Sequence, residues 1–148
     1  MENKLDIKIV ENLDDLIKVF IVRGIVFIEE QNVDYEIEKD KYELQAQHIL
    51  AEIGNEPVGA ARIRYIGNWA KLERIAVRKG YRGKGYGHRI VDFMLENARK
   101  RGFNKYKMHA QAHLIGFYSE HDFEVQGEMF READIVHYLI TREDKDVK

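Results

Sequence analysis

Three extended segments joined by two short turns constrain the fold of this chain more than any other feature. QHILAEI (47–53), VGAARIRYI (58–66) and WAKLERIAV (69–77) are apolar and rich in strand-forming residues, and a Gly-Asn pair begins each connection between them. Connections this short join antiparallel neighbours, because a parallel pair needs a crossover of a dozen or more residues. The sequence therefore predicts a three-stranded antiparallel meander.

Further strands and helices surround this meander. A helix is expected from Asn12, which can cap its first turn, to about Gln31, with these residues on its apolar face: Leu13, Leu16, Ile17, Phe20, Gly24 and Phe27. A second apolar stripe, from Ile90 to Ala98, predicts a helix that ends near Gly102. The charged segment 35–43 is interpreted as a mobile loop or a short helix. The remaining segments predict a short helix over 114–121 and strands over 5–10, 104–110, 123–130 and 135–141. This order indicates an α/β (α+β mixed) fold, in which about four helices flank a mixed, mostly antiparallel sheet of about six to seven strands.

The composition excludes several classes of protein. No apolar run approaches the roughly 18 residues that a membrane-spanning helix needs, and residues 1–10 lack the pattern of a signal peptide. The chain has no cysteine, which excludes disulfides, thiolate zinc sites and cysteine nucleophiles. With 148 residues it is expected to form one domain with one hydrophobic core, located in the cytoplasm.

Charge is distributed unevenly along the chain. Residues 1–50 carry 6 Lys/Arg and 12 Asp/Glu, whereas residues 74–107 carry 11 Lys/Arg and 2 Asp/Glu. The net charge of −2 argues against a nucleic-acid partner, and the basic segment favours a small polyanion. A solvated helix face with lysine-rich turns is the alternative explanation.

The segment RGKGYG (82–87) connects the third meander strand to the following helix. Glycines leave backbone N–H groups open to close approach, and the positive end of the helix dipole attracts an anion. The segment is not a Walker loop, because Gly85 rather than Ser or Thr follows Lys84. It is not a dinucleotide G-x-G-x-x-G either, because its third glycine comes one residue early. A diphosphate suits this loop, and a tight turn without a ligand is the alternative.

Two motifs resemble those of the GNAT family of N-acetyltransferases. R-x-x-G-x-G within 82–87, preceded by LERIAV and opening a helix, resembles the family's acyl-CoA signature. QAHLIGFYSEHDF (111–123) resembles its pattern of Asn, Leu-Tyr, a short turn and Gly-Phe, with Gln111 in place of Asn and Asp122 in place of Gly. Four further segments are similar to the small bacterial ElaA/YjcF-type branch, whose substrates are largely uncharacterised: VFIEEQNV, AQHIL, PVGAARIR and KLERIAV.

The resemblance implies a GNAT-type fold over residues 1–148 and acetyl-CoA as cosubstrate, without a metal. The acetyl group would pass directly, in a ternary complex, to the primary amine of a small molecule or peptide. By the same resemblance, the backbone N–H near Ile75 polarises the thioester carbonyl, and the Tyr118 hydroxyl protonates the leaving thiolate. The implied cofactor-binding residues are Ile75, Ala76, Val77, Arg82, Gly83, Lys84, Gly85, Tyr86, Gly87, Gln111 and Tyr118.

Glu73 is the candidate catalytic base. In strict alternation it shares a strand face with Ile75 and Val77, where burial would raise the pKa of its carboxyl group. A raised pKa suits a base near neutral pH, and an amine nucleophile arrives protonated and must lose protons. The alternative is that Glu73 forms an ion pair on a solvated face, with Arg62, Arg64 or Arg74.

The histidines and the acidic residues leave further alternatives. The six histidines show no ligand spacing, so no metal site is expected. His48 and His109 lie on inward-leaning strands, where they either contact the acceptor and relay a proton or make ordinary hydrogen bonds. By resemblance, the acidic residues between Glu29 and Asp40 lie near the acceptor pocket. They either attract a cationic amine or form a solvated loop.

A non-catalytic acyl-CoA-binding sensor or regulatory module is the competing function. Such a module would keep the loop 82–87 but would need neither Glu73 nor Tyr118, and the presence of both residues favours the enzyme. An unpaired strand edge or a helix surface can also support a homodimer, although the sequence does not show one.

Overall fold

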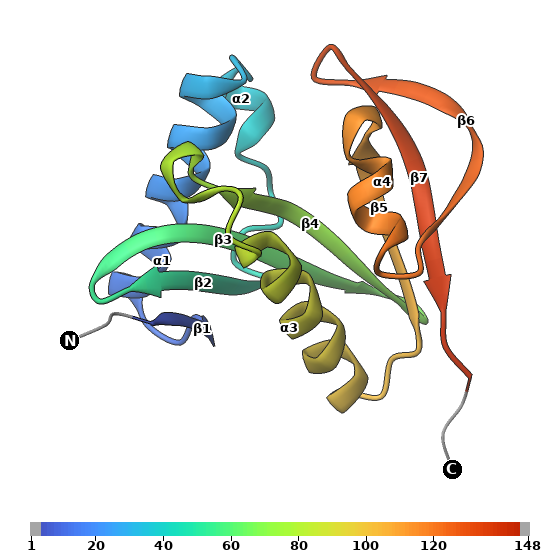
Figure 1. The fold of residues 1–148 in the computed structure, drawn as a ribbon, viewed down its shortest axis with the longest axis horizontal. Coiled ribbons are helices and arrows are strands. Elements are labelled where there is room, and N and C mark those ends of the chain that lie inside the picture. Colours follow the sequence, from blue (N-terminus) through green and yellow to red (C-terminus); the bar gives the residue numbers. More distant parts are fainter. Residues whose placement is uncertain (1–3, 146–148) are drawn as a thin grey trace.

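The computed structural model describes residues 4–145, in which seven strands form one sheet with the order β1-β2-β3-β4-β5-β7-β6 (Figure 1). In this part of the chain all neighbouring strands are antiparallel except β4 and β5, which are parallel. The strands are β1 (Leu5–Ile9), β2 (Gln47–Ile53), β3 (Glu56–Ile66), β4 (Trp69–Val77), β5 (Lys105–Gln111), β6 (Glu124–Glu132) and β7 (Ile135–Glu143). The predicted fold class is confirmed.

Helices cover both faces of the sheet. Their bounds are α1 (Leu13–Arg23), α2 (Tyr35–Glu38), α3 (Tyr86–Lys100) and α4 (Ile115–Ser119), with a π-helical segment (Gly24–Glu30) continuing α1. Two 3₁₀ turns, Lys79–Tyr81 and Ala112–Leu114, precede α3 and α4. α3 packs Ile90 and Met94 into the cluster on one face, and α1 packs Val19 and Val22 on the other. No helix among the described residues is long and apolar enough to cross a membrane.

Local signals in the sequence set the ends of these elements. The meander is present as predicted, and Gly54 and Gly67 both have positive φ in its turns. The Asn12 side chain accepts a 2.8 Å hydrogen bond from the backbone N–H of Asp15, which caps α1. Gly102 follows α3 with a φ of 92°, a conformation that glycine adopts without steric cost.

The predicted apolar face of α1 is wrong. Leu13 is 71% exposed and Ile17 is 48% exposed, whereas the buried residues are Asp15, Val19, Val22 and Arg23. The helix has two apolar stripes, and the sheet covers the one that contains Val19 and Val22. This orientation also places Arg23 beside the carboxylates of Glu38 and Glu43. The periodicity of the sequence cannot choose between two such stripes.

The parallel strands β4 and β5 separate along their length. Their ladder contains the pairs Ala70–Tyr106 and Lys71–Lys107, both near the start of the two strands. Beyond Lys71 the strands diverge, so that their carboxyl ends border an opening in the sheet (Figure 1). Among the described residues no strand pairs with the backbone groups along this stretch on that side, which makes the opening suitable for an extended ligand.

Candidate active site

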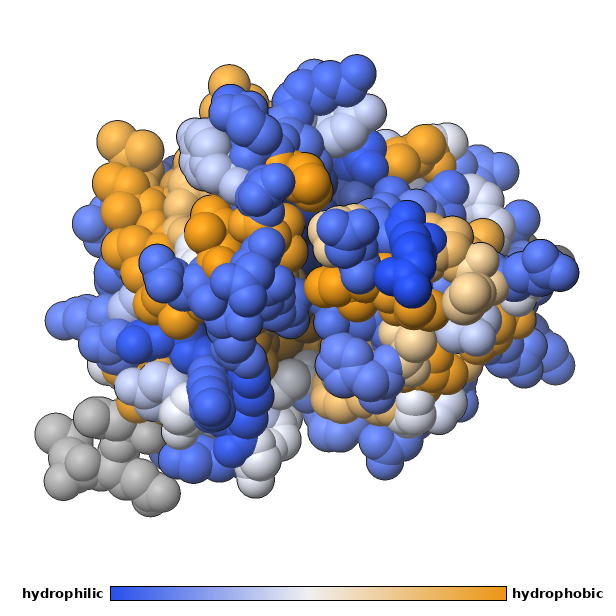
Figure 2. All heavy atoms as spheres, turned by 90° about the horizontal axis from the view of Figure 1, so that it is seen from above, coloured by the Kyte–Doolittle hydropathy of each residue, from blue (hydrophilic) through white to orange (hydrophobic). Residues whose placement is uncertain are grey.

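A cavity of about 360 Å³ lies where β4 and β5 diverge. Seen from above, the surface is hollowed between its two halves (Figure 2). The opposite faces of the sheet both contribute to the wall, because side chains alternate along β5. Met108 and Ala110 belong to the cluster with Tyr118, and His109 and Gln111 point to the other face.

A bulge in β4 changes the predicted surroundings of Glu73. Pairing of β3 with β4 shifts between Ala60 and Arg62, and Arg74 has a φ of 53°. Leu72 and Ile75 therefore belong to the same hydrophobic cluster on the α3 face, which strict alternation would forbid. Glu73 pairs with Arg62 on the α1 face, so the expectation that it shares a face with Ile75 and Val77 is wrong.

Three cations surround the Glu73 carboxylate. Its oxygens lie 2.6 Å from Arg64 Nε, 3.1 Å from Arg62 Nε and 3.3 Å from Lys71 Nζ. Burial by itself would raise the pKa of Glu73, but the hydrogen bond from Arg64 and the charges of Arg62 and Lys71 lower it to about 2. The predicted rise in its pKa is wrong. The ion pairs with Arg62 and Arg64 match the alternative, but they are buried and do not lie on a solvated face.

The ion pairs of Glu73 belong to a larger buried charge network. Arg62 is fully buried and donates hydrogen bonds to Asp40 and Glu43, while Arg23, also buried, donates to Glu38 and Glu43. Burial by itself would raise the pKa of Asp40, but the hydrogen bond from Arg62 lowers it to about 2. The segment that begins with α2 is therefore held against the sheet by charge. Its carboxylates Glu38, Asp40 and Glu43 are paired with arginines. They are therefore neither part of a solvated loop nor free to attract a cationic amine.

The loop 82–87 presents a row of backbone amides at the start of α3. Gly83 and Gly85 have φ values of 80° and 81°, and Gly85 occupies the N-cap position without a side-chain cap. Arg89 donates the first helical hydrogen bond, to the Gly85 carbonyl. Within residues 4–145 no group accepts a hydrogen bond from the amides between Gly83 and His88. Unpaired amides at a helix N-terminus form an anion-binding site.

The loop 82–87 contacts three neighbouring elements: the end of β4, the π-helical segment and α4. Arg82 donates to the Val77 carbonyl at the end of β4 and forms a two-point ion pair with Glu30. Gly87 lies against α4, because a Cβ placed there would come within 3.1 Å of the Phe117 ring. Ile75, Gln111 and Tyr118 line the cavity, whereas Ala76, Val77 and the loop lie outside the lining that the described residues form.

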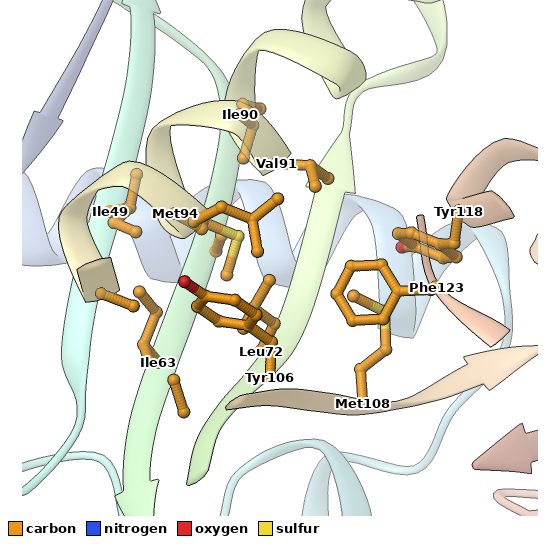
Figure 3. Packing of buried hydrophobic residues seen from close by; sticks show 14 of the residues in the cluster. Ile49, Ile63, Leu72, Ile90, Val91, Met94, Tyr106, Met108, Tyr118 and Phe123 are labelled. Carbon is orange, nitrogen blue, oxygen red and sulfur yellow. The ribbon is translucent and has the colours of Figure 1, made fainter. Parts of the chain in front are cut away.

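Tyr118 lies in the cavity wall on the α3 face. Its ring packs beside Phe123, on the same side as Met108 (Figure 3). Burial raises the pKa of Tyr118 above its ordinary value, so the hydroxyl stays protonated at neutral pH. No group in residues 4–145 forms a hydrogen bond with this hydroxyl.

The opposite wall contains a carboxylate between two histidines, which the sequence did not predict. His109 Nδ1 lies 3.1 Å from Glu132 Oε1, and His137 Nε2 lies 3.8 Å from Glu132 Oε2. Nearby, Gln111 donates a 3.0 Å hydrogen bond to Gln31 across the cavity. Alternation along β5 signals that His109 and Gln111 share a face, but only the β6–β7 hairpin brings Glu132 to them. Among the described residues no group of three or more His, Cys, Asp or Glu side chains has the arrangement of a metal site.

Comparisons with known proteins agree with this arrangement. The acetyltransferase (GNAT) family model matches residues 15–123. YjcF of Bacillus subtilis, described as an N-acetyltransferase, is 36% identical over 136 residues, which are 91% of this chain and 97% of YjcF. The crystal structure of Escherichia coli ElaA is 25% identical and has a TM-score of 0.84, covering 96% of this chain and 100% of the ElaA chain.

A more distant structure has a ligand. A Bacillus subtilis acetyltransferase, solved in complex with CoA, is 19% identical with a TM-score of 0.73, covering 96% of this chain and 100% of that chain. At this identity the likeness concerns the fold. The family match and the relationship to YjcF and ElaA confirm the resemblance that the two sequence motifs indicated. The chain belongs to the GNAT family and is an N-acetyltransferase.

Proposed function

We propose that residues 1–148 act as one cytoplasmic domain that transfers the acetyl group of acetyl-CoA directly to a primary amine. The observation that carries this proposal is the row of amides between Gly83 and His88, which have no partner among the described residues. Arg82 joins their loop to the end of β4. A diphosphate bound there is neutralised by the helix dipole and by Lys84. The complex of a GNAT relative with CoA supports the same cosubstrate here.

The diverging strands suit the rest of the cosubstrate. Beyond Lys71 the edge of β4 that faces β5 has no ladder partner in the described part of the chain, so its amides and carbonyls are free to bind the pantetheine arm. The arm would run past Val77 and Ala76 and bring the thioester to Ile75, Gln111 and Tyr118 in the cavity wall. A backbone N–H near Ile75 would stabilise the oxyanion that forms when the amine attacks the carbonyl carbon.

The roles of the two predicted catalytic side chains differ. Tyr118 keeps its proposed role, because a protonated hydroxyl with no partner among residues 4–145 is free to donate its proton to the leaving thiolate. A carboxylate with a pKa near 2 accepts protons poorly at neutral pH, so the base role is not proposed again for Glu73. We assign Glu73 to holding Arg62, Arg64 and Lys71 in the cavity wall.

Thiol release tests the proposed reaction. The protein is mixed with acetyl-CoA and, in turn, spermidine, lysine, kanamycin and a lysine-containing peptide, and free thiol is measured over time. Thiol release with any of these amines supports the enzyme. Calorimetric binding of CoA without turnover on any of them favours a non-catalytic binding module, and absence of both binding and turnover contradicts the proposal. Sedimentation velocity on the same sample tests whether the chain forms a homodimer.

Replacing Gly85 by alanine is expected to weaken CoA binding about tenfold. A side chain at a φ of 81° costs about 1–2 kcal/mol, which the loop can relieve only by moving its amides away from the diphosphate. Gly80→Ala is the matched control, because Gly80 precedes the loop, has no positive φ and has free space around it. Calorimetric titration with CoA measures both variants. Equal affinities would contradict binding of the diphosphate by these amides.

Replacing Tyr118 by phenylalanine is expected to lower kcat about 100-fold, at the lower end of general-acid effects, with little change in KM for acetyl-CoA. The hydroxyl makes no hydrogen bond with the described residues, so its loss should not unfold the protein. Steady-state kinetics and a thermal melt of the variant measure the two effects. An unchanged kcat would leave Tyr118 with a packing role alone.

A further inference from the structure

Amine acetylation needs a proton acceptor that the residues assigned so far do not supply. The acceptor nitrogen arrives as an ammonium group and must lose a proton before it can attack a carbonyl carbon. Glu73 is a weak base because the surrounding cations lower its pKa, and the Tyr118 hydroxyl is protonated. The proton acceptor must therefore be another group of the cavity wall.

His109 presents such an atom to the cavity. Its Nδ1 lies 3.1 Å from the Glu132 carboxylate, which can only accept a hydrogen bond when ionised, so Nδ1 carries the proton. The hydrogen bond from His109 lowers the pKa of Glu132, which keeps that carboxylate ionised. In the neutral ring the lone pair is then on Nε2, which has no hydrogen-bond partner among residues 4–145. The ring is a partly exposed part of the cavity wall.

The other histidine of this cluster is placed differently. His137 Nδ1 donates to the carbonyl of Ile135 at 2.7 Å, and its Nε2 faces Glu132 at 3.8 Å. Both nitrogens are therefore directed at protein groups, and the side chain is buried. Of the two rings, His109 has the nitrogen that an incoming amine can reach.

His109 and Tyr118 reach the cavity from opposite faces of the sheet. Met108 and Ala110, the neighbours of His109 on β5, pack in the same cluster as Tyr118, so alternation directs His109 to the other side. A thioester held between β4 and β5 would then have a proton donor on the side of the leaving thiolate. It would have a proton acceptor on the side from which the amine approaches.

We propose that His109, oriented by Glu132, is the general base that deprotonates the acceptor amine. This inference rests on the proposed function. His109 Nε2 takes one proton from the ammonium group and becomes an imidazolium stabilised by Glu132. The amine lone pair forms the C–N bond, and the C–S bond breaks with its electron pair going to sulfur. Tyr118 gives its proton to the thiolate, and the nitrogen, which loses a second proton as the amide forms, restores the proton of Tyr118. His109 returns its own proton to water.

Charged groups on several elements face this pair. Glu132 lies on β6 and His137 on β7, while Lys71 and Glu73 line the same cavity from β4. His109 is the member of this group with a free acceptor nitrogen, because Lys71 and Glu73 are paired with each other. Among these groups the role of proton acceptor therefore falls to His109.

Kinetics of His109→Gln give the main test. We expect kcat to fall about 100-fold with the best amine of the panel, with KM for acetyl-CoA changed less than twofold. The pH profile should also change, so that the rate rises with pH only as the free amine forms. Glu132→Gln should give a smaller loss, and His113→Gln, an exposed ring outside the cavity lining, should match wild type. Wild-type turnover and pH profile in His109→Gln would overturn the inference while leaving the transferase intact.

The tautomer of His109 gives a second test that needs no acceptor amine. Imidazole nitrogen chemical shifts of the full chain, assigned by comparison with His109→Gln, should show the proton on Nδ1 and a bare Nε2. In Glu132→Gln this preference should weaken. A proton on Nε2 in the neutral wild-type ring would overturn the inference, whether or not any amine is turned over. Absence of both CoA binding and turnover would instead contradict the proposed function.

Discussion

Replacing Arg62 by methionine is expected to lower the free energy of unfolding by about 3–5 kcal/mol. The guanidinium is fully buried and binds three carboxylates, those of Asp40, Glu43 and Glu73. Methionine fills much of the same volume but leaves these carboxylates without their shared partner in a poorly solvated site. Urea denaturation followed by circular dichroism measures the change.

The matched control is Arg131→Met. Arg131 is exposed on β6 and donates only to a backbone carbonyl, that of Asp134, among the described residues. Its replacement should change the free energy of unfolding by about 0.5 kcal/mol or less. Similar losses in the two variants would show that the buried network does not hold the α2 segment against the sheet.

Acid is expected to unfold the protein through the same network. The pKa values of Glu73 and Asp40 in the folded chain are about 2, below the ordinary values of 4.5 and 3.8. A depressed pKa stabilises the folded state fully above the ordinary value, and this contribution is lost as pH falls toward the folded value. Stability should therefore decline between about pH 5 and pH 2, and Glu73 should account for about 3 kcal/mol of the decline.

The slope of stability against pH tests this linkage. Glu73→Gln has no carboxylate to titrate, so its free energy of unfolding should vary less with pH in this window than that of the wild type. Glu128→Gln is the control, because Glu128 is exposed on β6 and forms no ion pair with the described residues. A Glu73→Gln slope equal to the wild-type slope would show that Glu73 titrates normally in the folded protein.

The sequence was sufficient wherever the determining interactions are local. Gly54 and Gly67 set the turns of the meander, Asn12 caps α1, and Gly102 follows α3. The position of the loop at the start of α3 was also predicted, because its glycines lie between a strand pattern and the apolar stripe of a helix. These signals act within a few residues of one another, so no knowledge of the tertiary contacts was needed.

The predicted chemistry of Glu73 failed for a non-local reason. The adjacent residues Leu72 and Arg74 do not indicate a bulge in the sequence, because the bulge arises from the pairing of β4 with β3. Two of the cations that pair with Glu73, Arg62 and Arg64, lie on the neighbouring strand β3. Burial alone would have raised the pKa as predicted, and tertiary contacts reversed the direction.

The sequence by itself determined the order of the elements, the turns and the amide-rich start of α3, since each depends on local backbone preference. Only the tertiary structure decided which stripe of α1 is buried, where β4 and β5 separate, and which carboxylates are paired. It also brought Glu132 to His109, 23 residues apart in the chain. The reason is electrostatic: the protonation of a buried group depends on the charges that folding places around it, and these charges come from distant segments.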